Sequence, residues 1–112
     1  MAEEILGEFE HIVLLAVLRL RDDAYGMKVR VEISQRTGRD VSIGAVYATL
    51  DRLAAKGIVR SELGEATAER GGRAKRTFSL TAEGMRAIER TQEQIRSMAA
   101  GLALPLGKGS RA

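Results

Sequence analysis

The chain has 112 residues, of which 45% are apolar and 29% charged, with a formal net charge of +3 and no cysteine. These values predict one globular domain with a single core, and they exclude a disordered chain, disulfides and thiolate metal sites. The longest apolar run, residues 12–18, is too short to span a bilayer, and no signal-peptide pattern opens the chain, so we expect a cytoplasmic protein with no membrane partner.

Positive charge is concentrated in the middle of the chain. The first 18 residues contain four glutamates and no lysine or arginine, whereas four cations lie within residues 70–76 with no acid between them. This asymmetry favours a polyanionic partner, although a solvated charged face gives the same pattern.

The first predicted helix spans residues 5–20. Apolar residues recur there at helical spacing, and additional leucines extend the apolar surface beyond one face. Such a helix needs more than one neighbour. It therefore either lies at the centre of the fold or contacts a second copy of the protein.

Two shorter helices are predicted next, over residues 24–36 and 43–56. Gly38 supplies the stop signal of the first, and Ser42 is a typical N-cap for the second. The buried positions expected in the second of these helices are Ile43, Val46, Leu50 and Leu53.

Residues 58–63 and 75–80 are predicted strands joined by a glycine-bearing connection, and Thr81 caps a last helix that runs to about residue 100. The chain is therefore expected to be mainly α with a small β-hairpin. Three helices followed at once by a hairpin form a winged helix-turn-helix, predicted over residues 1–80. Residues 81–102 form a separate C-terminal helix, and residues 103–112 are expected to be a disordered tail.

The third predicted helix has the features of a DNA recognition helix. Small side chains outside the buried stripe allow close approach to the major groove, although small residues also suit plain helix packing. Arg52 and Lys56 follow, where they could meet phosphate or a base edge. The small outward residues are Gly44, Ala45, Ala48 and Thr49.

Further DNA contacts are predicted around this helix. Tyr25 and Tyr47 border apolar stripes, so each ring either belongs to the core or directs its hydroxyl toward phosphate. Lys28 lies on the second helix in a position suited to phosphate, and the helix end at Ser42 exposes amides that could bind one. The hairpin bend carries Gly71, Gly72 and Arg70 together with the predicted contacts Arg73, Lys75 and Arg76.

Three motifs resemble the PadR-like family of transcriptional regulators. They are DAYGMKV at residues 23–29, SIGAVYATLDRLAAKGIV at 42–59 and GGRAKRTFSLTAEG at 71–84, within a similarity that covers roughly residues 5–88. Two positions depart from the family pattern: Ala48 stands where many members have proline, and Phe78 stands where tyrosine is common. Neither change removes a charge.

The resemblance implies a homodimeric winged-helix repressor of the short-tailed form, which binds double-stranded DNA at an inverted-repeat operator. It also implies a dimer contact through the first and last helices and an acidic N-terminal segment that lies away from the DNA. A small apolar effector near the dimer interface could be lined by Phe9, Met85 and Met98. The dimer residues expected on this basis are Ile5, Leu6, Phe9, Val13, Met85, Ile88, Ile95, Met98 and Leu102.

Two other classes of function compete with DNA binding. An enzyme is disfavoured because His11 is the only histidine and no paired-carboxylate, phosphate-loop or metal-ligand spacing occurs, so no catalytic residue, metal or cofactor is predicted. A winged helix that binds other proteins is a stronger alternative, since a fold does not fix a function. A steep salt dependence of binding would distinguish DNA from a protein partner.

Overall fold

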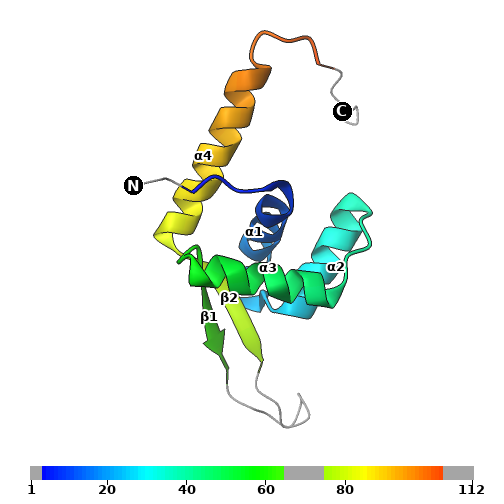
Figure 1. Cartoon of the computed structure of the whole chain (residues 1–112). Coiled ribbons are helices and arrows are strands. Elements are labelled where there is room, and N and C mark those ends of the chain that lie inside the picture. The colour runs from blue at the N-terminus through cyan, green and yellow to red at the C-terminus, as the bar shows by residue number, and fades with distance from the viewer. Residues whose placement is uncertain (1–3, 65–74, 105–112) are drawn as a thin grey trace.

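The computed structural model describes residues 4–64 and 75–104, and it contains helices and a hairpin in the predicted order (Figure 1). The helices are α1 (Glu8–Leu20), α2 (Gly26–Thr37), α3 (Ile43–Ala55) and α4 (Ala82–Ala99). A single 3-10 turn, η1 (Arg21–Asp23), links the first two. The strands are β1 (Val59–Leu63) and β2 (Arg76–Leu80). Most of the tail predicted at 103–112 lies outside the described residues.

The first helix begins at Glu8, three residues later than its apolar pattern suggests. Gly7 is extended and donates its N–H to the carboxylate of Glu10 at 3.0 Å, which caps the helix start. Ahead of it, Leu6 is buried and donates its backbone N–H to the Thr91 hydroxyl at 2.9 Å. The apolar residues before Gly7 therefore belong to a docked extended segment.

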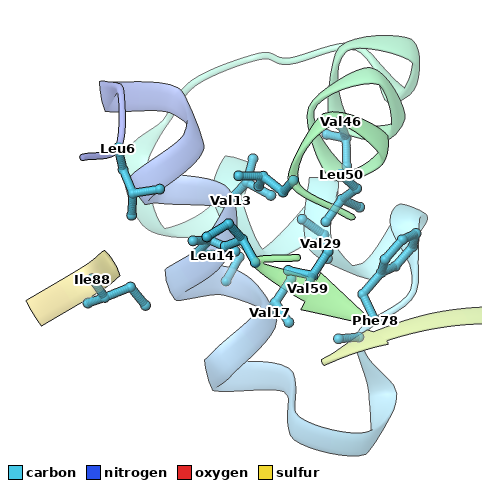
Figure 2. Packing of buried hydrophobic residues seen from close by; sticks show 14 of the residues in the cluster. Leu6, Val13, Leu14, Val17, Val29, Val46, Leu50, Val59, Phe78 and Ile88 are labelled. Atoms are coloured by element: carbon cyan, nitrogen blue, oxygen red, sulfur yellow. The ribbon is translucent and has the colours of Figure 1, made fainter. Parts of the chain in front are cut away.

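The core is built around α1, which packs against α2, α3, α4 and β2 (Figure 2). Val13, Leu14 and Val17 are at most 1% exposed, and they meet Val29 of α2 and Leu50 of α3 within one buried cluster. Of the two explanations for its broad apolar surface, the central position in the fold is therefore confirmed for most of the helix. Leu18 remains exposed.

The stop signal of α2 and the start signals of α3 and α4 act as the sequence predicts. Gly38 ends α2 with a left-handed φ of 76°, which glycine adopts without steric cost. The Ser42 hydroxyl accepts the N–H of Ala45 at 3.0 Å, and the Thr81 hydroxyl accepts that of Gly84, also at 3.0 Å. Ile43, expected to be buried, is only half-buried at the first position of α3.

The hairpin is antiparallel, with Phe78 opposite Ser61. Phe78 points into the core and Ser79 outward, as the alternation of side chains along a strand requires. The residues before α2 extend this pairing, since Tyr25 bridges Thr77 and the Phe78 N–H donates to the Ala24 carbonyl at 2.8 Å. Strand β2 is thus tied to the start of α2 near the end that adjoins the bend. Within the described residues, no helix is long and apolar enough to cross a membrane.

Candidate nucleic-acid interface

The exposed face of α3 is formed by small residues. Gly44, Ala45 and Ala48 are all exposed, and Ser42 caps the helix beside them. The prediction that Thr49 also points outward is wrong, because its side chain is only 3% exposed. Thr49 lies three residues after Val46 and four before Leu53, which places it on the buried stripe of the helix.

Tyr47 lies at the edge of this face with its ring over the start of α2. A Cβ atom at Gly26 would lie 2.4 Å from its Cζ and 2.6 Å from its hydroxyl oxygen, so only glycine leaves room for the ring. The ring is half-buried and its centroid lies 6.4 Å from that of Phe78. Gly26 therefore positions Tyr47, a role that the sequence analysis did not assign although the Tyr-Gly pair at 25 and 26 was noticed as a motif.

The start of α2 carries Tyr25 and Lys28 close to Lys75, which directly precedes β2. The ammonium of Lys75 lies 4.0 Å from the centre of the half-buried Tyr25 ring, within the range of a cation–π contact. Lys28 forms an exposed ion pair with Asp23 at 3.2 Å. The hydrogen bond that Lys28 donates to the Asp23 carboxylate raises the pKa of Lys28 above its ordinary value.

Arg76 connects the hairpin to α3. Its guanidinium lies 2.7 Å from the Asp51 carboxylate and 4.9 Å from the centre of the Phe78 ring. The other cation predicted to contact DNA from the hairpin, Arg73, lies outside the described residues together with Arg70 and the two glycines of the bend.

Arg52 and Lys56 lie beside the acidic N-terminal segment. The Lys56 ammonium is 3.0 Å from the Glu4 carboxylate and 3.4 Å from that of Glu10. Arg52 lies 4.0 Å from Glu10 and donates to the Thr49 hydroxyl at 3.3 Å. The acidic segment is therefore in contact with the candidate recognition helix, whereas the family resemblance implied that it lies away from the DNA.

The residues expected in a dimer contact divide into three groups by exposure. Leu6, Val13 and Ile88 are at most 6% exposed within a single chain, so the prediction that they contact a second copy is wrong. Phe9 is half-buried, with the Arg39 guanidinium 5.4 Å from its ring centre. The others remain exposed on the surface: Ile5, Met85, Ile95, Met98 and Leu102.

Within residues 4–64 and 75–104, no group of three or more histidine or acidic side chains is placed to hold a metal ion. His11 is half-buried between α1 and α4, where its Nε2 lies 3.3 Å from the Gln92 amide nitrogen. Burial lowers the pKa of His11 below its ordinary value. These contacts are those of a packing residue between two helices.

Comparison with known proteins gives a consistent assignment. The model of the transcriptional regulator PadR-like family matches residues 14–90. A PadR family transcription regulator from Clostridium difficile superimposes with a TM-score of 0.66 at 24% identity, over 80% of this chain and 90% of that one. A winged-helix DNA-binding protein from STIV gives a TM-score of 0.61 at 26% identity, over 86% of this chain and 97% of that one. No curated protein matches the chain.

Proposed function

Because the chain belongs to the PadR-like family of transcriptional regulators, and is accordingly not an enzyme, we propose that it is a homodimeric repressor that binds an inverted-repeat operator. The observation that carries the proposal is the exposed small-residue face of α3, formed by Gly44, Ala45 and Ala48, beside a cationic hairpin. A major groove of about 12 Å admits a helix whose outward side chains are short.

The cations around α3 support phosphate contacts on the hairpin side of this face. Lys75 over Tyr25, Lys28 and Arg76 all lie at or near the junction of α2 with the hairpin. Two of these cations are paired with exposed carboxylates, Lys28 with Asp23 and Arg76 with Asp51. Both carboxylates are more than half exposed, so these pairs are weak and a phosphate can replace the carboxylate on binding.

The exposed apolar residues of α4 support the homodimer. Ile95 is 61% exposed, Met98 80% and Leu102 62%, and the C-terminal half of the helix projects beyond the other helices (Figure 1). A continuous apolar strip of this kind marks an interaction surface. Two copies related by a two-fold axis would present two recognition helices to half-sites about one DNA turn apart.

The test is selection of duplex fragments from a random pool, followed by titration of the selected and random duplexes at several salt concentrations. We expect an inverted repeat to be enriched, and Ala48→Glu to abolish the preference for it. Lys75→Ala should weaken binding to all duplexes and reduce the slope of log affinity against log salt by about 0.9. Arg86→Ala, which removes an exposed cation from α4, is the matched control. It should leave the affinity for duplexes and the salt slope unchanged.

A protein that binds no duplex at low salt would contradict the proposal. The alternative, a winged helix that binds only other proteins, would then be favoured. A monomeric protein that binds DNA would contradict the dimer and the inverted repeat alone.

A small apolar effector is also part of the proposal, on the basis of the family resemblance. Its support is an open pocket of about 140 Å³ between α1 and α2. Its apolar floor includes Ile12, Leu15 and Ile33, its polar rim is Arg19, Glu32, Arg36 and Thr37, and Phe9, Met85 and Met98 do not line it. An engineered cavity of about 150 Å³ binds benzene. A one-ring compound should therefore raise the melting temperature, and an unchanged temperature at saturating phenol would count against this site.

A further inference from the structure

The acidic N-terminal segment, residues 4–10, is fixed in place between α4 and α3. Leu6 is 6% exposed, and its N–H donates to the buried Thr91 hydroxyl at 2.9 Å. The Arg90 guanidinium donates to the backbone carbonyl of Glu4 at 3.2 Å. The segment passes α4 before it enters α1 (Figure 1). Its glutamates are therefore held at defined positions rather than on a free tail.

Each described glutamate of this segment reaches a cation on α3 or on the turn that precedes it. Glu10 is the most buried of them, with its side chain 15% exposed, and one of its oxygens also caps α1 through Gly7. The pairs are Glu4 with Lys56 at 3.0 Å, Glu8 with Arg39 at 3.1 Å, and Glu10 with Lys56 at 3.4 Å and Arg52 at 4.0 Å.

These cations lie on a different side of α3 from the hairpin. Arg52 and Lys56 are four residues apart and share one side of the helix. Asp51, which pairs with Arg76 of β2, lies 100° around the helix from Arg52. Gly44 and Ala48 lie between these two sides, and Ala45 lies on the side of Arg52 and Lys56. Carboxylates of the N-terminal segment thus border the face proposed to enter the groove.

The position of these carboxylates determines which cations are available to DNA. Non-specific affinity comes from the number of phosphates that free lysines and arginines neutralise, whereas discrimination comes from base contacts. A cation that already has a carboxylate partner gains less from a phosphate. Carboxylates within a Debye length, about 8–10 Å, also repel the DNA backbone directly.

We propose that Glu4 and Glu10, and to a smaller extent the more exposed Glu8, are specificity-determining residues. They occupy Lys56, Arg52 and Arg39 in place of phosphate and so hold down non-specific affinity. The N-terminal half of α3 then provides sequence discrimination, and the cations on the hairpin side bind phosphate. The inference rests on the proposed function, since it requires that the protein binds duplex DNA.

The test compares wild type with E4Q, E8Q, E10Q and the triple variant on a random-sequence duplex and on a selected duplex. Each freed cation should steepen the salt slope by about 0.9, so the triple variant should be steeper by roughly 2 to 3. Its affinity for the random duplex should rise on the order of tenfold at low salt. The ratio of selected to random affinity should fall. E89Q makes the same charge change at an exposed position of α4. It should leave the salt slope, the affinity for the random duplex and the affinity ratio unchanged.

A second arm isolates the ion pairs from net charge. K56Q should have little effect in the wild-type background, where Lys56 is occupied by two carboxylates. In the E4Q/E10Q background, the same change should remove about 0.9 of the gained slope. Equal effects of K56Q in both backgrounds would overturn the inference.

The outcomes separate the inference from the proposed function. If wild type binds no duplex, the proposed function fails. If wild type binds and the folded triple variant keeps the wild-type slope, only the inference fails. Should the triple variant lose its cooperative melting transition, E8Q decides, because the Glu8 side chain is 77% exposed and its described ion pair is with Arg39 alone.

Discussion

Gly26→Ala tests how the protein positions Tyr47. The added Cβ would lie 2.4 Å from the tyrosine Cζ, so the ring must move by about 1 Å to reach an ordinary contact of 3.4 Å. Overpacking of this kind costs about 1–3 kcal/mol. Alanine in place of glycine in a helix returns about 0.5–1 kcal/mol. We therefore expect a net loss of about 1 kcal/mol in the free energy of unfolding.

A double-mutant cycle with Tyr47→Ala isolates the contact. Without the ring, Gly26→Ala should stabilise the protein by about 0.5–1 kcal/mol, which gives a coupling energy of roughly 2 kcal/mol. Gly44→Ala is the matched control near the start of α3, because the nearest atom to its added Cβ is 4.0 Å away. It should stabilise the wild-type protein by about 0.5–1 kcal/mol.

The assay is urea unfolding followed by circular dichroism at one fixed protein concentration, since dimerisation would make stability depend on concentration. Gly26→Ala should also weaken DNA binding, because the displaced ring carries the Tyr47 hydroxyl with it. An equal cost of Gly26→Ala with and without the Tyr47 ring would refute the reasoning.

Three further substitutions test other contacts. Thr91→Val should lower the free energy of unfolding by about 1–3 kcal/mol, because it leaves the buried Leu6 N–H without its acceptor. Thr91→Ser keeps a hydroxyl and should cost less. Equal losses of the two variants in urea unfolding would contradict this. Arg21 has a positive φ of 54°, so Arg21→Gly should be about 1 kcal/mol more stable than Arg21→Ala, and the reverse order of melting temperatures would contradict it. The folded-state pKa of His11 is lowered, so the unfolded chain binds more protons just below pH 6.5 and stability falls as the pH drops through that range. His11→Gln should flatten this pH dependence in melting curves measured between pH 5 and 7. An unchanged profile would rule out His11 as its source.

The helices and the hairpin could be predicted because their ends carry local signals. Gly38, Ser42 and Thr81 each act through atoms within four residues along the chain. The start of α1 could not be predicted in this way. Leu6 continues the apolar pattern of the helix, but its N–H bonds to Thr91, 85 residues away, and no local pattern shows that contact.

The candidate interface was predicted in outline and not in its charge pairing. The small face of α3 follows from helical periodicity. The same periodicity places Thr49 on the buried stripe, although its small size had assigned it to the outward face. Val13 and Ile88 were assigned to a dimer because an apolar stripe does not reveal what covers it. The pairing of Glu4 and Glu10 with Lys56 joins segments about 50 residues apart and became visible only in the fold.

The most direct measurement of the central claim is the change in backbone amide NMR shifts when a selected duplex is added. The account predicts large changes at Gly44, Ala45 and Ala48 on α3 and at Lys75 beside β2, with Ile95 on α4 unchanged. Changes confined to α4, or none at low salt, would contradict the claim that this protein reads DNA with α3.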